Sequence, residues 1–275
     1  MRNFIIFFDE KEGTSPLVRL LDNFDQISVV HPVGESWEPF DRHSCGWLSM
    51  HDLTQCFDMI FGENLLDMER LNAIYTKTAN APLEVIDTSG SIGFKMRFLP
   101  PHPIALHKLF RSTMIDLLKE NDVTVFLAVR QDIFRWALSK YHGDGTGKPG
   151  HMQFKSANGE LGNGEIGKIY VYADRLEEIL RACEESHARK RRLMKDMQSI
   201  GIRVHPLRYE NFLADKRAYF THLLEALELE LPEHDLDAAL QKGAYYKKVH
   251  SDDISHFVEN HEEMTEHFGH RFVSW

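Results

Sequence analysis

The sequence predicts an α/β fold in which helices cover both faces of a central parallel β-sheet. The run 123–129 is apolar apart from Thr124, as in a central parallel strand that is buried on both faces. Similar runs alternate with segments whose apolar residues recur every three or four positions, the spacing of amphipathic helices. The chain has 275 residues, of which 43% are hydrophobic, and is long enough to bury such a three-layer core.

The first half of the chain opens with a strand, a helix and a second strand. Residues 3–8 are apolar and β-rich, the leucines of 16–24 follow at helical spacing, and another apolar run spans 26–30. We expect the 26–30 strand to be the parallel neighbour of the first strand. One or two helices within 48–75 and a strand at 91–98 follow.

The rest of the chain, from residue 104 onward, continues the alternation of strands and helices around one irregular segment. Glycines are dense and large apolar residues few between 143 and 167, which predicts a long irregular loop and makes this segment a candidate lid. The other predicted elements are a helix at 104–119, the strand 123–129, a helix after Arg130, a long charged helix at 174–199, a strand at 202–207 and a helix at 211–227. We expect a single domain that spans 1–275.

Composition narrows the class of function. A formal net charge of -10 argues against a surface for nucleic acid, so any anion site must be local. The sequence has three widely spaced cysteines, Cys45, Cys56 and Cys183. Their odd number and spacing argue against a disulfide framework and a zinc ribbon, and fit a reducing compartment. The apolar run near the N-terminus meets Asp9 too soon for a signal peptide or a membrane span. We therefore expect a cytoplasmic protein, whose oligomeric state the sequence leaves open.

The segment 11–15 lies between the first predicted strand and helix, where backbone N–H groups at a helix N-terminus can bind a phosphate. Gly13 permits a close backbone approach, Lys11 supplies a positive charge, and Thr14 and Ser15 supply hydroxyl donors. An equally weighted alternative is an ordinary turn in which Thr14 or Ser15 caps the helix. The pattern GxxxxGK[ST] is missing, which disfavours a P-loop nucleotide kinase.

A second candidate anion site follows the central strand. Arg130 stands at the carboxyl end of this strand, where ligands of open α/β sheets bind, and Ser139 lies on the next predicted helix. Arg135, on the same predicted helix, could equally contact the anion. Taken alone, Arg130 is more simply explained by a pair with Asp132, and Ser139 by a helix position without a function.

Together the two sites resemble those of the PAPS-dependent sulfotransferases, which use 3'-phosphoadenosine 5'-phosphosulfate as donor. The resemblance spans most of the chain and is strongest to bacterial carbohydrate sulfotransferases of the nodulation-factor and trehalose type. It implies a three-layer, P-loop-like fold. It also implies that the loop binds the 5'-phosphosulfate through Lys11, Gly13, Thr14 and Ser15. Arg130 and Ser139 would hold the 3'-phosphate.

Three weaker likenesses follow in the family's order along the chain, namely Gly93-Phe94-Lys95, Arg208-Tyr209-Glu210-Asn211 and Val258-Glu259-Asn260. The sequence departs from the family at Glu12, where a small residue is usual. An acid there repels the sulfate unless its side chain turns outward. This departure makes a non-catalytic nucleotide-binding protein of the same fold the main alternative to an enzyme.

Sulfuryl transfer needs a base for the acceptor hydroxyl and cations for the growing charge. Glu38, in a Glu-Pro-Phe segment that resembles the site of a catalytic glutamate in related bacterial enzymes, is the first candidate base. Glu35 and His102 remain alternatives, as does a purely structural role for Glu38. Lys11 is the expected cation at the bridging oxygen, with Lys95 a weaker candidate because strand lysines often line a sheet edge.

The resemblance implies PAPS as co-substrate, no metal, and an acceptor hydroxyl on a carbohydrate or a lipid-linked molecule. The spacing of His261 and His267 does not match HExxH, so no metal site is expected there. The basic run 189–192 lies within the long charged helix, and the simplest interpretation of this run is a solvated face.

Overall fold

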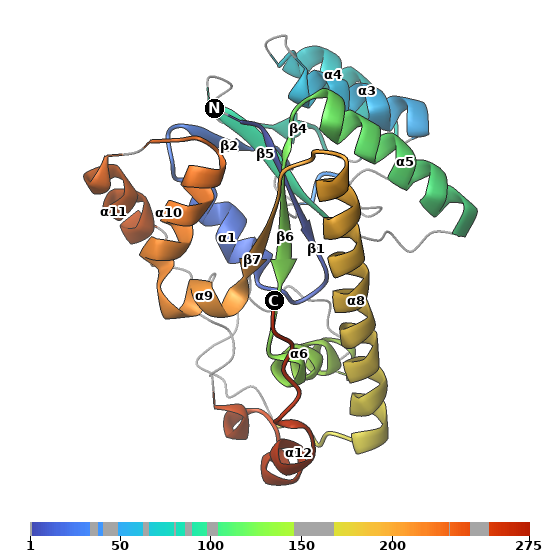
Figure 1. The fold of residues 1–275 in the computed structure, drawn as a ribbon, viewed down its shortest axis with the longest axis vertical. Coiled ribbons are helices and arrows are strands. Elements are labelled where there is room, and N and C mark those ends of the chain that lie inside the picture. The colour runs from blue at the N-terminus through green and yellow to red at the C-terminus, as the bar shows by residue number, and fades with distance from the viewer. Residues whose placement is uncertain are drawn as a thin grey trace. The chain divides into compact units, whose positions relative to one another are not determined.

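The computed structural model describes residues 2–33, 38–40, 49–62, 66–79, 81–85, 90–97, 104–145, 168–230, 232–242 and 253–275. Figure 1 labels most of the elements in these ranges. They are β1 (Phe4–Phe8), α1 (Thr14–Leu21), β2 (Ile27–Val29), β3 (His31–Pro32), α3 (Met50–Phe61), α4 (Met68–Tyr75), β4 (Leu83–Glu84), β5 (Ser91–Arg97), α5 (Ile104–Glu120), β6 (Thr124–Val129), α6 (Ile133–Gly145), α8 (Ala173–Ser199), β7 (Val204–Arg208), α9 (Tyr209–Ala214), α10 (Lys216–Ala226), α11 (Glu233–Lys242), the 3-10 helix η2 (Ile254–His256) and α12 (His261–Phe268).

The chain divides into two compact units. The first unit comprises residues 1–129 and 190–243, and the second comprises 130–189 and 244–275. Helix α8 therefore contributes to both, with Lys190 as its first residue in the first unit. That the whole chain folds as one domain stays a prediction.

The first unit is built on a parallel sheet with the strand order β2-β5-β1-β6-β7. The predicted α/β class with a central parallel sheet is confirmed. One detail of the prediction was wrong: β2 pairs with β5, not with β1. Strand β5 lies between them, and six of its seven residues are buried, as is typical of an interior strand. A short antiparallel pair of β3 and β4, which the sequence did not predict, forms a separate sheet.

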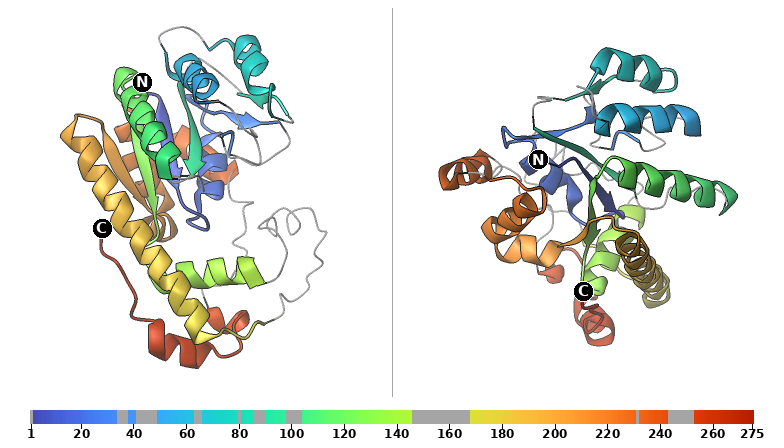
Figure 2. Two further views of the ribbon diagram at one scale, coloured as in Figure 1. Left: turned by 90° about the vertical axis from the view of Figure 1, so that its right-hand side faces the viewer. Right: turned by 45° about the horizontal axis from the view of Figure 1, so that its top comes forward.

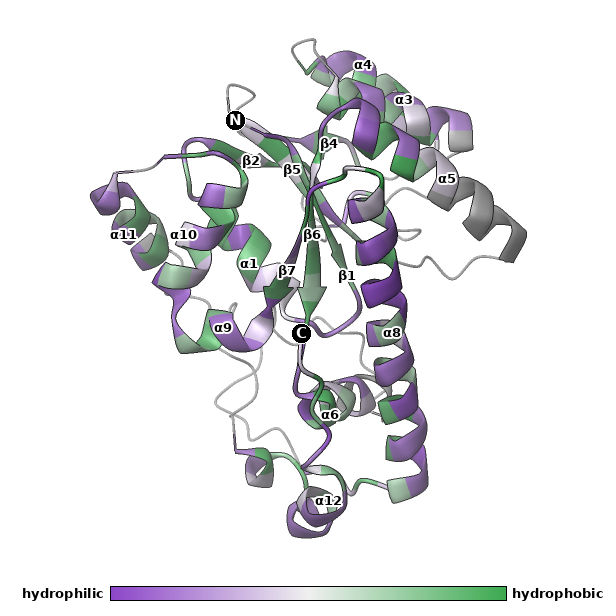
Figure 3. Cartoon of the chain, in the orientation of Figure 1, coloured by the Kyte–Doolittle hydropathy of each residue, from purple (hydrophilic) through white to green (hydrophobic). Residues whose placement is uncertain are grey.

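Side chains alternate between two cores on the opposite faces of this sheet. On β1, Ile5 and Phe7 join a cluster with α3, α4, α5 and the end of α8. Phe4, Ile6 and Phe8 join a second cluster with α1, α9, α10 and α11. Figure 2 shows α3 and α5 on one side of the strands, with α10 and α11 on the other. Strand β6 is among the most hydrophobic segments in Figure 3, in keeping with its burial on both faces.

Two other predicted boundaries were wrong. The single helix expected at 211–227 is two helices, because Asp215 adopts an extended conformation and its side chain accepts a hydrogen bond from the Ala218 N–H at 2.9 Å, which caps α10. The irregular loop expected from 143 does not begin there, because α6 continues through Gly145. The remainder of the predicted lid, 146–167, lies outside the described residues.

The second unit packs α6, the first part of α8, η2 and α12 around its own core, in which Trp136 is fully buried. The side-chain amide of Asn260 pairs with both backbone groups of Val171, accepting from its N–H at 3.0 Å and donating to its carbonyl at 2.9 Å. Asn260 therefore substitutes for a neighbouring strand beside this extended segment.

The close approach of β5 to β1 depends on Gly93. A Cβ atom at this position would lie 2.5 Å from the carbonyl oxygen of Phe4. We therefore expect Gly93→Ala to lower the free energy of unfolding by about 2–4 kcal/mol, because backbone cannot move aside as a flexible side chain can. Urea denaturation measures this, with Ile92→Val as a control that removes one methyl group and costs about 1 kcal/mol. Equal stability of Gly93→Ala and the wild type would contradict the β1–β5 register.

Candidate active site

The backbone of the loop between β1 and α1 passes through two left-handed residues before the helix begins. Lys11 and Gly13 both adopt left-handed conformations, with φ of 65° and 79°. Helix α1 begins at Thr14, its N-cap is Gly13, and no side chain caps it. The alternative in which Thr14 or Ser15 caps the helix was therefore wrong. Without a side-chain cap, the first N–H groups of α1 are in the arrangement that binds phosphate.

Gly13 is required here for two reasons. Its left-handed φ suits glycine, and the ring of Tyr209 lies where a Cβ atom would be. Tyr209 belongs to the Arg208–Asn211 segment, one of the three weaker likenesses found in the sequence. The structure thus brings these two segments of the first unit into contact.

Glu12 turns into the protein, not outward to solvent. Its side chain is 3% exposed and forms an ion pair with Lys190, which is fully buried. The same carboxylate oxygen accepts a hydrogen bond from the Asp9 N–H at 2.6 Å, while Lys190 Nζ also donates to the Ala128 carbonyl at 2.8 Å. Burial raises the pKa of Glu12 to about 7, although Lys190 acts in the opposite direction. The interpretation of 189–192 as a solvated face was wrong at Lys190.

Lys190 could have been found from the spacing of α8. Apart from Ser186, the buried residues of this helix recur at three and four positions, a spacing that places His187 and Lys190 among apolar residues; the spaced residues are Leu176, Leu180, Cys183, His187, Lys190, Leu193 and Met197. Three arginines beside Lys190 in sequence obscured the pattern. A lysine on a buried stripe needs an acidic partner, and the atypical Glu12 is that partner.

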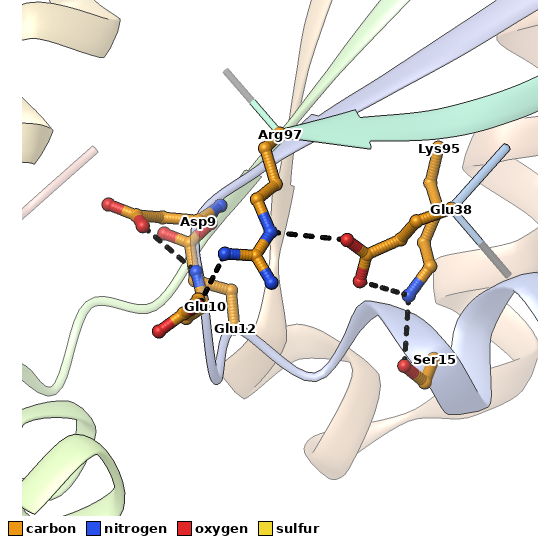
Figure 4. A network of polar contacts seen from close by, with 7 residues as sticks. All are labelled: Asp9, Glu10, Glu12, Ser15, Glu38, Lys95 and Arg97. Carbon is orange, nitrogen blue, oxygen red and sulfur yellow. Dashed lines mark hydrogen bonds and ion pairs between the residues drawn. The ribbon is translucent and has the colours of Figure 1, made fainter. Parts of the chain in front are cut away.

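A second polar cluster lies beside the loop in the same unit (Figure 4). Lys95, which is 2% exposed, donates to the Ser15 hydroxyl at 3.0 Å and lies 3.4 Å from a carboxylate oxygen of Glu38. The other oxygen of Glu38 accepts from Arg97 at 3.1 Å, and Arg97 also pairs with Glu10. Burial lowers the pKa of Lys95, and the charge of Glu38 opposes this shift. The site therefore joins a hydroxyl at the start of α1 to a lysine and a carboxylate.

The segment that carries Glu38 is anchored in the core. Phe40 packs against the rings of Phe57, Tyr75 and Phe94 with centroid distances of 5.1, 5.9 and 4.8 Å. The hydroxyl of Tyr75 donates to the carbonyl of Pro39. Aromatic packing two residues after Glu38 thus fixes its carboxylate at the end of β5.

Lys95 is more central than the sequence suggested. The expectation of a sheet-edge lysine was wrong, because β5 lies between β2 and β1. The ammonium group also lies over the Phe8 ring at 4.8 Å from its centroid. Glu35 and His102, the alternative bases, lie outside the described residues.

Arg130 and Ser139 belong to the second unit. Both are half-buried, Arg130 directly after β6 and Ser139 within α6. Asp132 begins this helix by accepting from the Arg135 N–H at 2.9 Å, and it pairs with the Arg135 side chain at 3.2 Å. Arg135, the other candidate cation, is therefore engaged at the start of α6.

Two features of the described residues bear on other functions. They contain no cluster of three or more residues of the types histidine, cysteine, aspartate and glutamate arranged to hold a metal ion. No helix within the described ranges has the length and hydropathy needed to cross a membrane.

The ion pair between Glu12 and Lys190 predicts a strong coupling of stabilities. At pH 8, Lys190→Met leaves a buried carboxylate without its cation and should cost about 3–5 kcal/mol. Adding Glu12→Gln should recover much of this loss, because the remaining buried group is neutral. Urea denaturation of both single variants and the double variant measures the coupling. The control is Arg192→Met at an exposed position, whose free energy of unfolding should stay within about 0.5 kcal/mol of the wild-type value. Additive effects would show that the two side chains do not interact.

Glu12 also predicts a pH dependence of stability. Its pKa is about 7 in the folded protein and 4.5 as a model carboxyl, so the folded state binds more protons between these values. Stability from this group is complete below pH 4.5 and is lost as the pH rises through 7. Relative to Glu12→Gln, the wild type should lose on the order of 2 kcal/mol between pH 5 and pH 8. Parallel pH profiles of the two proteins would contradict the raised pKa.

No protein-family model and no curated protein sequence matches this chain. Among solved structures, it is similar to the sulfotransferase STF9 from Mycobacterium avium, with 14% identity, a TM-score of 0.44 and coverage of 98% of this chain and 75% of that one. It is also similar to a sulfotransferase from Alicyclobacillus acidocaldarius, with 14% identity, a TM-score of 0.45 and coverage of 98% of this chain and 92% of that one. A third similar structure is the mouse sulfotransferase SULT7A1 complexed with PAP, with 11% identity, a TM-score of 0.42 and coverage of 96% of this chain and 83% of that one. At these identities and scores, the similarity assigns this chain no activity.

Proposed function

We propose that this protein is a sulfotransferase that moves a sulfuryl group from PAPS to a hydroxyl of a carbohydrate or lipid-linked acceptor. The observation that carries the proposal is the contact between the first turn of α1 and Lys95. An uncapped helix N-terminus, the Ser15 hydroxyl, a buried lysine and the Glu38 carboxylate meet at one edge of the sheet. These groups match the two demands of the reaction, an anion cradle and a base beside a cation.

Glu38 would take the proton of the acceptor hydroxyl as the new oxygen–sulfur bond forms. The bond from sulfur to the bridging oxygen of the donor breaks, and the 5'-phosphate of the desulfated donor, PAP, leaves with the electron pair. Proton transfer to Glu38 removes the negative charge beside Lys95. The positive charge of Lys95 then becomes available to the leaving phosphate, next to Ser15, where negative charge grows.

Lys11 remains the proposed cation of the loop itself, and the geometry adds Lys95 as a second one. Gly13, Thr14 and Ser15 would hold the 5'-phosphosulfate, and Arg130 with Ser139 the 3'-phosphate. Glu12 is compatible with this arrangement because Lys190 neutralises it within the protein. Glu12 therefore no longer favours the alternative of a non-catalytic nucleotide-binding protein.

Binding and turnover separate the proposed roles. Isothermal titration calorimetry should show PAP binding at micromolar affinity and weaker binding of ATP, with or without magnesium. Arg130→Ala should weaken PAP binding at least tenfold, because a charge-assisted phosphate contact is lost. Glu38→Ala should leave PAP binding nearly intact and lower sulfuryl transfer at least 100-fold.

The control for this experiment is His234→Ala, an exposed change on α11 that should alter neither quantity. A preference for ATP with magnesium would point to a nucleotide kinase instead. PAP binding without transfer to any hydroxyl acceptor would support the non-catalytic alternative.

A further inference from the structure

The carbonyl group of Arg130 is held by a buried histidine. His187 lies on α8, is 2% exposed, and has its Nε2 atom 2.9 Å from the Arg130 carbonyl oxygen. A carbonyl oxygen only accepts hydrogen bonds, so Nε2 must carry the proton. The contact is made within the second unit, from a helix far along the chain to the residue that directly follows β6.

The other ring nitrogen of His187 has a complementary partner. The indole N–H of Trp275 donates to Nδ1 of His187. An indole nitrogen only donates, so Nδ1 must be the unprotonated nitrogen. The two contacts together select the neutral Nε2–H tautomer, because a proton on Nδ1 would face the indole N–H.

Trp136 connects His187 to the helix that carries Ser139. Its ring meets His187 edge-on, with 5.4 Å between centroids, and it is fully buried on α6 one turn before Ser139. The ring of Trp275 lies on His187 at the same centroid distance. His187 therefore contacts the backbone of Arg130 directly and the helix of Ser139 through Trp136.

The segment that ends in Trp275 also pairs with the backbone after Arg130. The N–H of Val273 donates to the Gln131 carbonyl at 2.9 Å, and the N–H of Ile133 donates to the Arg271 carbonyl at 3.1 Å. Together with the His187 side chain on the Arg130 carbonyl, these hydrogen bonds hold the backbone at Arg130, Gln131 and Ile133. A turn held at several residues presents its side chains from a fixed position.

The geometry points to His187 as a positioning residue for the 3'-phosphate site. This inference rests on the proposed function, in which Arg130 and Ser139 hold that phosphate. His187 would not touch the nucleotide. It would fix the Arg130 backbone and α6 so that both side chains meet the phosphate without losing conformational freedom on binding.

Two isosteres of histidine separate this role from general packing. The amide nitrogen of Gln occupies nearly the position of Nε2, so His187→Gln keeps a donor to the Arg130 carbonyl. The amide of Asn reaches only the position of Nδ1, so His187→Asn keeps a partner for Trp275 and loses the contact to Arg130. The ligands are PAP and adenosine 5'-phosphate, which differ only by the 3'-phosphate. Exposed His256→Asn is the matched control.

His187→Asn should bind PAP about tenfold more weakly than the wild type and bind adenosine 5'-phosphate equally well, while His187→Gln stays within about threefold for both ligands. Equal losses for both ligands in His187→Asn, or PAP affinity unchanged, would overturn the positioning role. A wild type that does not prefer PAP to adenosine 5'-phosphate would overturn the proposed function itself, and this inference with it.

If His187→Asn does not fold, as circular dichroism would show, Trp275→Phe provides the decisive variant. It keeps an aromatic ring and removes the half of the indole that carries the N–H selecting the tautomer. We expect a loss of PAP affinity of about threefold and unchanged binding of adenosine 5'-phosphate. Unchanged affinity for PAP in this variant would refute the inference.

Discussion

The buried ion pair of Glu12 and Lys190 constrains the arrangement of the first unit more than any other polar contact described above. It joins the loop after β1 to α8, and through the Ala128 carbonyl it includes β6. Buried pairs add little net stability because desolvation offsets their attraction. Their stronger effect is on register, since sliding α8 by one residue would leave a charge buried without its partner. The conformation of the β1–α1 loop follows from the need to keep Glu12 paired with Lys190.

The strand order determines which residues can meet at the loop. Because β5 and β6 flank β1, the loop after β1 lies between the carboxyl ends of both neighbours. Strand β5 carries Lys95 and Arg97 near its end, and both contact Glu38. A parallel sheet thus collects charged groups from distant parts of the sequence at one edge. In this cluster the carboxylates of Glu38 and Glu10 balance the charges of Lys95 and Arg97.

Sequence patterns were sufficient where local signals and burial agree. The apolar runs of β1 and β6 predicted interior strands, and Lys11-Glu12-Gly13 predicted a turn before a helix. The patterns failed where a pairing between distant segments decides the outcome. Nothing near β2 indicates that β5 inserts beside β1, and nothing near Lys95 distinguishes an edge strand from an interior one. Lys190 and His187 carried a usable signal in the spacing of α8, but polar residues on a buried stripe are recognised only with their partners in view.

The discontinuous first unit has a consequence for the order of events during synthesis. Strands β1, β2, β5 and β6 precede residue 130, whereas β7 comes after the whole segment 130–189 of the second unit. The sheet therefore emerges from the ribosome without its last strand and exposes the edge of β6, a strand that is apolar apart from Thr124. Bringing β7 to β6 across this long intervening segment carries an entropic penalty, which the pairing of the two strands must offset. Lys190 arrives shortly before β7, so neutralisation of Glu12 and completion of the sheet belong to the same late step of folding.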